Sequence, residues 1–150
     1  MSHVVAGKQE VKDIDSFEQA CKNLGLTFVR NQKTFSWFGQ WLNDFQAKEA
    51  AFNLGIEPSK YGTCEHAVKV PGSTYEIGLM RNNEGRLLVV FDFWGVNGRA
   101  IQEKVGDVGN LLMQEYALCV GERTAKSRGY NTQRIRMSDR VRLRVTGSRM

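Results

Sequence analysis

Arginine alternates with apolar residues near the C-terminal end of the chain. Apolar side chains stand between arginines on two short segments that a turn separates, within residues 134–145. The guanidinium group donates two parallel hydrogen bonds from a rigid fork, which suits phosphate. The candidate phosphate-binding residues are Arg134, Arg136, Arg142 and Arg144, with Arg123, Lys126 and Arg128 before them. The alternative is a solubilising face, or a hairpin whose charged edges prevent aggregation.

The alternation also predicts how the two strands of this hairpin pair. Facing residues of a hairpin share a face, so the length of the loop decides which side chains lie together. A two-residue loop mixes apolar and charged side chains. A three-residue loop at 138–140 keeps one face apolar and sets Arg136 opposite Arg142, and Arg134 opposite Arg144. We therefore predict the longer loop and a single face that carries all four arginines, although like charges repel.

The positive charge is concentrated in the last fifth of the chain. The formal net charge is +5. Residues 1–120 contain 12 Lys and Arg against 14 Asp and Glu, a net charge of −2, whereas residues 121–150 contain 9 against 2, a net charge of +7. This asymmetry favours an anionic partner, and nucleic acid or the phosphate of a nucleotide is the expected class.

Aromatic side chains provide a second set of candidate contacts. Trp37 and Trp41 lie in an aromatic segment at 34–64, and Trp94 follows a predicted strand. Their rings can stack on bases, which is worth about 1–3 kcal/mol per base. Aromatic residues at strand ends more often belong to the core. The segment also suits an interface with a host protein or with a second copy of the chain.

Asp92 is the one acidic residue in an apolar strand at 87–93. A carboxylate buried there can act as an acid or base, with His3 as its candidate partner. The more usual alternative is that Asp92 accepts hydrogen bonds from backbone N–H groups where the strand turns into a helix, near Gly95 and Asn97. Neither a nucleophile with its base nor a metal-ligand set is visible, so a binding protein without metal or cofactor is favoured over an enzyme.

The strands that must position these residues centre on one hairpin. Residues 75–80 alternate between apolar and other side chains, 82–85 have turn chemistry, and 87–93 are apolar on both faces, as in a strand covered on both sides. Further strands are predicted at 3–11, 26–30 and 65–70. The pattern indicates an antiparallel sheet.

Capping spacing predicts a helix that begins within 13–16 and ends at Gly25. Either Asp15 with Glu18 or Ser16 with Gln19 has the spacing of a capping box, in which each partner satisfies a free backbone N–H group. Glycine is the usual residue just after a helix end.

A second, longer helix is predicted from Ile101 to Cys119 and on to Gly129, with apolar residues at a period of 3.6. It runs through Gly106 and Gly109, each of which weakens a helix by about 1 kcal/mol relative to Ala. The two glycines indicate either a break or a place where the helix backbone lies close to the sheet.

These elements predict one α+β domain over residues 1–150. It has a mainly antiparallel sheet with two main helices on one face, a short inserted helical and aromatic segment at 34–64, and a basic C-terminal hairpin at 130–146. No apolar run approaches a membrane span, and the N-terminus lacks the apolar core of a signal peptide. Together with three widely spaced cysteines (Cys21, Cys64 and Cys119), this favours the cytoplasm and reduced thiols.

Several short segments also match the pattern of a known family. They are 1–3, 11–15, 24–25, 75–79, 92–96 and 114–117, with the final hairpin. Their order and spacing resemble the uncharacterised proteins encoded in plastid and cyanobacterial genomes and in bacteriophages, which are described as a conserved chloroplast reading frame or a domain of unknown function. The resemblance implies an α+β fold with two helices on one antiparallel sheet, and no activity or catalytic residue.

The chain departs from that family in two places. Residues about 40–64 look like an insertion, and Arg140 stands after Asp139 where the family often has Gly. The resemblance implies a prokaryotic, organellar or phage setting. The insertion favours a phage-encoded member in the cytoplasm of a bacterial host.

Overall fold

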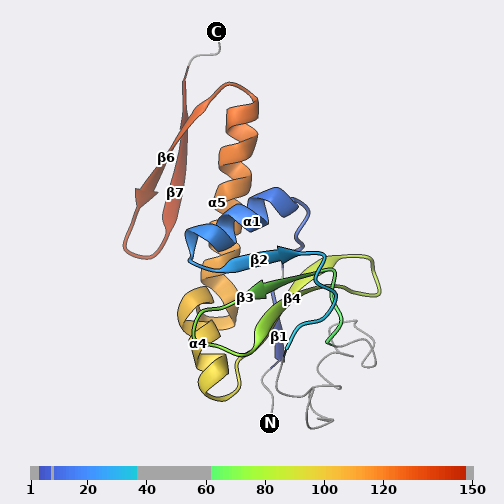
Figure 1. The fold of residues 1–150 in the computed structure, drawn as a ribbon. Helices are drawn as coiled ribbons and strands as arrows, with labels where there is room; N and C mark the ends of the chain where they lie inside the picture. The colour runs from blue at the N-terminus through green and yellow to red at the C-terminus, as the bar shows by residue number, and fades with distance from the viewer. Residues whose placement is uncertain (1–3, 8, 37–61, 148–150) are drawn as a thin grey trace.

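The computed structural model describes residues 4–7, 9–36 and 62–147. Its centre is an antiparallel sheet of five strands in the order β1-β5-β4-β3-β2 (Figure 1). The strands are β1 (Val4–Ala6), β2 (Thr27–Arg30), β3 (His66–Lys69), β4 (Glu76–Arg81) and β5 (Leu87–Asp92). Every residue of β5 is buried, as its apolar sequence predicts for a strand covered on both faces.

The helices pack on one face of this sheet, and a separate hairpin follows them (Figure 1). The elements are α1 (Ile14–Asn23), α4 (Gly95–Val105), the short 3-10 helix η2 (Asp107–Gly109), α5 (Asn110–Ser127), β6 (Asn131–Arg136) and β7 (Val141–Thr146). The predicted α+β class is confirmed. Within the described ranges, no helix is both long enough and apolar enough to span a membrane.

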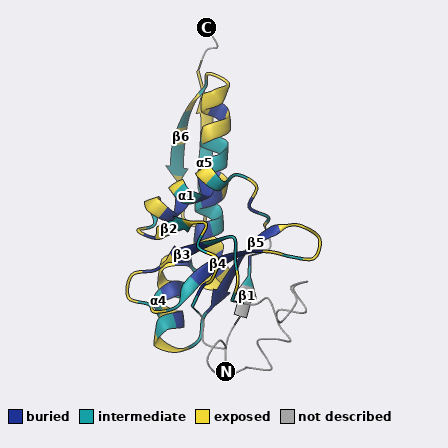
Figure 2. Cartoon of the chain, turned by 45° about the vertical axis from the view of Figure 1, so that its right-hand side comes forward, coloured by how far each residue is buried: buried dark blue, intermediate teal, exposed yellow. Residues whose placement is uncertain are grey.

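The core lies between the sheet and the helices. Its largest fully buried side chains include Phe17 of α1, Ile77 and Leu79 of β4, Phe91 of β5 and Ile101 of α4. Figure 2 shows that burial is concentrated in the sheet and in the part of α5 beside it. The opposite sheet face is also buried at Ala67, Met80, Leu88 and Val90.

The predicted long helix is two helices, so the alternative of a break at its glycines is correct. Gly106, Val108 and Gly109 all have positive φ, at 85°, 49° and 78°. Val108 fits the 3.6-residue period of apolar residues in the predicted helix, which would bury it. Because the chain turns here, its side chain is instead 61% exposed. The second alternative also holds, because a Cβ on Gly109 would lie 2.5 Å from the Phe91 ring. Position 109 therefore requires glycine for two reasons: its positive φ, and the close approach of the Phe91 ring.

The cap of α1 differs from the predicted ones. Asp13 is the N-cap, and its carboxylate accepts a hydrogen bond from the backbone N–H of Ser16 at 3.1 Å. The prediction of Asp15 or Ser16 in that role was wrong, because the helix begins two residues earlier than the Asp15 pattern implies. The entry to α1 is tied to α5: the Tyr116 hydroxyl oxygen accepts hydrogen bonds from the backbone N–H groups of Lys12 and Asp13, at 3.0 and 3.1 Å.

The two ends of the predicted insertion meet at the sheet edge. Thr34 and Thr63 form an antiparallel bridge, and the Phe35 N–H donates to the Gly62 carbonyl oxygen at 3.0 Å. The Phe35 ring is buried, and it occupies the space that a side chain at Gly78 would need. Residues 37–61 lie outside the described residues.

The contact at Gly109 predicts a stability difference between two glycine substitutions. Gly85 has the same left-handed backbone, with φ of 79°, but nothing lies within 4 Å of its Cβ position. We expect Gly85→Ala to lower the free energy of unfolding by about 1–2 kcal/mol through backbone strain alone. Gly109→Ala adds a clash with Phe91 and should cost about 1–3 kcal/mol more, as overpacked cores do. Urea unfolding measures both, and equal losses would show that the Phe91 contact is unimportant.

Candidate functional site

The C-terminal hairpin packs along the second half of α5, away from the central sheet (Figure 1). It forms a sheet of two strands only. Gly121 of α5 permits the close approach, because a Cβ there would lie 2.7 Å from Leu143 Cδ2. In contrast to the central sheet, the hairpin and the adjoining turns of α5 are largely exposed (Figure 2).

The hairpin has the shorter of the two possible loops. Arg136 pairs with Val141 and Arg134 pairs with Leu143, and the Met137 N–H donates to the Arg140 carbonyl oxygen at 2.8 Å. The predicted three-residue loop is therefore wrong. That prediction assumed that the hairpin hides a purely apolar face, whereas the surface it covers on α5 carries carboxylates.

The correct register divides the four predicted arginines between two faces, because side chains alternate along a strand. The inner face, toward α5, contains Arg134, Arg136, Val141, Leu143 and Val145. The outer face contains Gln133, Ile135, Met137, Arg140, Arg142 and Arg144. A single face with four arginines does not form.

Arg134 is the link between the hairpin and α5. Its guanidinium group lies 2.8 Å from Glu115 and 2.7 Å from Glu122, and the Arg134 and Glu115 side chains are only 28% and 14% exposed. Glu115 also accepts a hydrogen bond from Asn23 of α1 at 2.9 Å. Arg134 is thus neutralised by the protein's own carboxylates, and its predicted role as a phosphate ligand is not available in this arrangement.

The charges of this ion pair shift both pKa values toward the ionised forms. Burial acts to raise the pKa of Glu115, but hydrogen bonds from Asn23 and Arg134 outweigh it and the pKa lies below 4.5. Hydrogen bonding to Glu122, then to Glu115, raises the pKa of Arg134. A carboxylate with a depressed folded pKa stabilises the fold above its unfolded pKa, and this contribution is lost as the pH falls below 4.5 through the folded pKa.

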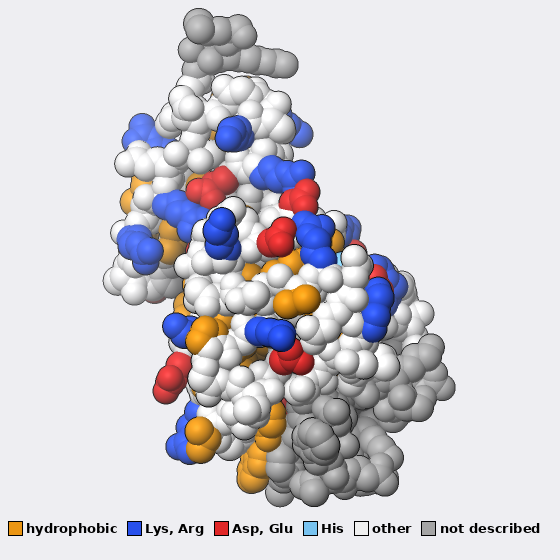
Figure 3. Space-filling view, in the orientation of Figure 1, with side chains coloured by type: hydrophobic (Ala, Val, Ile, Leu, Met, Phe, Trp, Pro, Cys, Tyr) orange, Lys and Arg blue, Asp and Glu red, His pale blue; other side chains and the backbone are white. Residues whose placement is uncertain are grey.

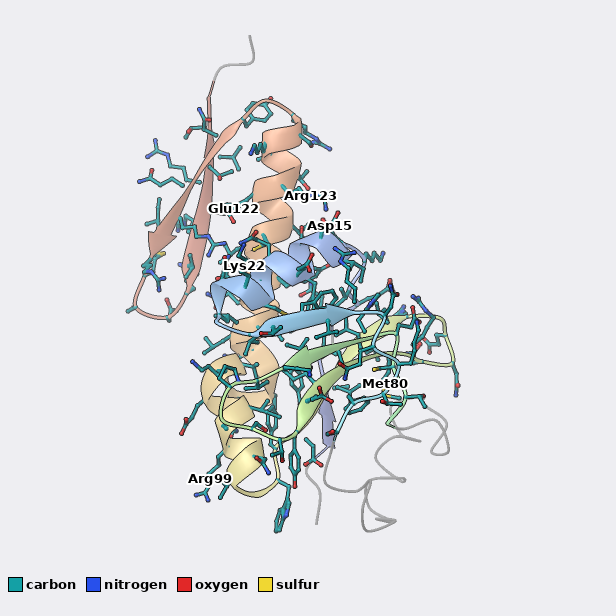
Figure 4. All side chains as sticks on the ribbon, viewed as in Figure 1. Asp15, Lys22, Met80, Arg99, Glu122 and Arg123 are labelled. Atoms are coloured by element: carbon teal, nitrogen blue, oxygen red, sulfur yellow. The ribbon has the colours of Figure 1, made fainter. Side chains whose placement is uncertain are left out.

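Arg123 is the second basic residue that the fold uses internally. It lies 2.6 Å from Asp13 and 3.2 Å from Asp15, so it joins α5 to the start of α1. Figure 4 shows Asp15, Glu122 and Arg123 gathered where α1 and α5 meet, beside the hairpin. Such exposed pairs contribute little to stability, but they reduce the charge available to a ligand.

The remaining basic residues of this end face solvent. Lys126, Arg128, Arg136, Arg142 and Arg144 are exposed and form no ion pair with any acidic residue in the described ranges. Arg140, which sequence analysis did not include, lies 4.0 Å from Asp139, at the limit of an ion pair. Figure 3 shows Lys and Arg side chains spread over the hairpin and α5, with carboxylates between them toward α1.

Asp92 and Trp94 do not join this surface. Asp92 is fully buried and its carboxylate accepts a hydrogen bond from the Trp94 N–H at 3.0 Å, which confirms a bond to the backbone at the strand-to-helix corner. Trp94 is the residue before α4, at the opposite end of the molecule from the hairpin (Figure 1). His3, Trp37 and Trp41 lie outside the described residues.

A cleft that sequence analysis missed lies between α1, α5 and the start of β6. Its volume is about 550 Å³. Its lining includes Ser16, Gln19, Lys126, Tyr130, Asn131 and Thr132. These residues come from two distant parts of the chain, so no local pattern unites them. The one local signal is the polar run Tyr130-Asn131-Thr132 directly after Gly129.

Comparison with known proteins adds no assignment. No family model, no curated protein and no solved structure matches this chain. The resemblance to the plastid, cyanobacterial and phage proteins therefore stays a prediction. In the described part of the chain, no three His, Cys, Asp or Glu side chains gather in a group that could hold a metal ion.

The two inner-face arginines provide a matched test of the hairpin anchor. We expect Arg134→Gln to lower the free energy of unfolding by about 1–3 kcal/mol, because it leaves two carboxylates without their hydrogen-bonded partner. Arg136→Gln, two residues along the same face, should change it by less than about 0.5 kcal/mol. Urea unfolding and amide hydrogen exchange of β6 measure the effect. Similar values for the two variants would contradict a specific anchor.

Proposed function

We propose that this protein is a non-enzymatic module that binds nucleic acid through the outer face of the β6–β7 hairpin. The observation that carries the proposal is the position of Arg142 and Arg144, which are exposed, outward-facing and unpaired within the described part of the chain. Arg140 lies on the same face. The setting that fits is the cytoplasm of a bacterium or of a phage-infected host.

The shape and spacing of this face suit a nucleic-acid backbone. A two-stranded antiparallel ribbon is one of the two elements that the major groove of DNA admits. Alternate residues of a strand are about 6.6–6.8 Å apart along its axis, close to two steps of about 3.4 Å along the axis of a DNA duplex. Arg142 and Arg144 of β7 therefore have about twice the phosphate rise between them.

The neighbouring side chains favour a mixed contact over a purely electrostatic one. Ile135 is half-buried and Met137 is 41% exposed on the same outer face. Apolar side chains in a groove can contact the methyl group of thymine, and those on a single strand can pack against bases. Lys126 and Arg128, at the end of α5, extend the positive charge beyond the hairpin.

The proposal predicts the effect of removing two outer-face charges. We expect the double variant Arg142→Gln/Arg144→Gln to bind a fluorescein-labelled DNA duplex more weakly. The slope of log affinity against log salt, between about 50 and 200 mM, should fall by about one for each phosphate that the protein no longer neutralises. Fluorescence anisotropy measures both quantities.

The matched control removes the same charge elsewhere. Arg99 and Lys104 of α4 are exposed, lie at the far end of the molecule (Figure 4 labels Arg99) and form no ion pair in the described ranges. The variant Arg99→Gln/Lys104→Gln should keep the affinity and the salt slope of the unchanged protein. Equal losses in the two double variants would show that net charge alone drives binding. If the unchanged protein bound neither duplex nor single-stranded nucleic acid, the arginines would remain as protection of the hairpin edges.

A second candidate function is docking on a partner protein or a second copy through residues 37–61. The bridge between Thr34 and Thr63 favours it, because it brings the two ends of the aromatic segment 34–64 together at one place on the fold. We expect replacement of 37–61 by two glycines to keep the urea unfolding transition within about 1 kcal/mol, and to abolish any complex seen by native mass spectrometry. Unfolding of the variant would show that the segment is part of the core.

A further inference from the structure

The cleft between α1, α5 and β6 contains polar side chains that the fold does not use. The Lys126 ammonium, the Tyr130 hydroxyl, the Asn131 amide and the Thr132 hydroxyl make no side-chain hydrogen bond or ion pair within the described ranges. Tyr130 and Thr132 are half-buried, whereas Lys126 and Asn131 are exposed. Polar groups that converge on a concave site and that the fold does not use can bind a ligand.

The charges at the rim restrict the class of ligand. Asp15 is paired with Arg30 at 2.6 Å and with Arg123 at 3.2 Å, and Glu122 is paired with Arg134. Both carboxylates of the lining thus have an arginine partner, although Arg30, Arg123 and Arg134 are each shared with a second carboxylate, Glu18, Asp13 and Glu115 respectively. The cation that stays free is Lys126, which favours an anionic group at that position.

The rest of the lining is neutral and suits a nucleotide. The Asn131 amide can donate to and accept from the edge of a base, and the hydroxyl of Thr132 can bind a sugar hydroxyl. The Gln19 amide donates one hydrogen bond to Asn23 at 2.8 Å and keeps its carbonyl oxygen and second N–H for a base. The Tyr130 ring, half-buried at the cleft, offers an aromatic surface on which a base can stack. A volume of about 550 Å³ is within the range of small-ligand sites.

The cleft and the arginine face meet at the start of β6. Asn131 lines the cleft and is also the first residue of the outer face of β6, in line with Gln133 and Ile135. The rest of the cleft lies on the α5 side of the hairpin, so a nucleic-acid strand on the arginine face has to pass over the start of β6 to enter it. Lys126 is in the last turn of α5, five residues before the start of β6.

We propose that this cleft receives one unpaired nucleotide, with its phosphate near Lys126 and its base against Tyr130. The inference rests on the proposed binding of nucleic acid by the hairpin, and it makes single-stranded nucleic acid the preferred class of partner. In duplex DNA a base reaches such a cleft only after leaving the stack, which costs free energy.

The test compares variants of the cleft with variants of the hairpin. We expect Tyr130→Leu to weaken binding of a fluorescein-labelled single strand about 5- to 150-fold, the range that corresponds to removal of one base stack, and to leave duplex binding unchanged. Tyr130→Phe keeps the ring and should lose little. Arg142→Gln/Arg144→Gln should weaken binding of both probes. Single-strand affinity that is unchanged in Tyr130→Leu would overturn the inference while leaving the proposed function intact.

A second measurement tests the cleft without the hairpin. Titration with AMP, GMP, CMP and UMP, followed by NMR, should shift the side-chain amide signals of Gln19 and Asn131. Lys126→Gln should weaken these shifts, and Arg142→Gln/Arg144→Gln should not. Absence of shifts with all four nucleotides would overturn the cleft as a nucleotide site. If the unchanged protein showed the nucleotide shifts but did not bind duplex DNA, the result would count against the hairpin proposal and not against the cleft.

Discussion

The ion pair of Arg134 with Glu115 and Glu122 determines which surface this protein presents to a partner. It holds β6 on α5, and it does so at a place where the Arg134 guanidinium and the Glu115 carboxylate are mostly shielded from water. An ion pair in such a place gains little net free energy over apolar packing, but losing one partner is costly because the other charge stays behind. The ion pair thus fixes the register of β6 on α5. Because Arg134 pairs with Leu143 in β7, Arg142 and Arg144 lie on the face opposite to Arg134. The proposed binding face depends on this choice.

The position of the ion pair relative to the central sheet depends on how α5 is set against that sheet. The break at Gly106–Gly109 redirects the chain, and the contact of Gly109 with the Phe91 ring sets the start of α5 against β5. Farther along, the Tyr116 hydroxyl accepts the two backbone N–H groups that precede α1, and Arg123 binds Asp13 at the same corner. The second half of α5 then extends past the sheet, and the hairpin lies along it (Figure 1). A backbone turn deep in the fold thus positions the charged surface at its far end.

The basic residues of the last fifth of the chain serve two purposes. Arg123 and Arg134 balance carboxylates of α1 and α5, so they belong to the structure. Arg136, Arg142 and Arg144 keep their charge exposed. Exposed charge on a two-stranded hairpin also discourages its open edges from pairing with other chains. The same arginines can therefore serve both solubility and the proposed binding. The cleft differs in this respect, because free amide and hydroxyl groups in a concavity have no part in protection against aggregation. The cleft can contribute shape and hydrogen bonds to binding, whereas the hairpin contributes positive charge.

The sequence alone determined the elements that depend on neighbouring residues. The hairpin of β4 and β5, the end of α1 at Gly25 and the α+β class follow from side-chain period and turn chemistry, which act over a few residues. The sequence left two alternatives open at Gly106 and Gly109, and the contact of Gly109 with the Phe91 ring shows that both apply. The register of β6 and β7 was decided by Glu115 and Glu122, more than ten residues away in the chain, and pattern within the hairpin favoured the wrong loop. The cleft likewise exists because α1 and β6 meet α5 from different sides. Contacts between distant segments carry no local periodicity, so the outward arginines and the cleft were decided by the tertiary structure.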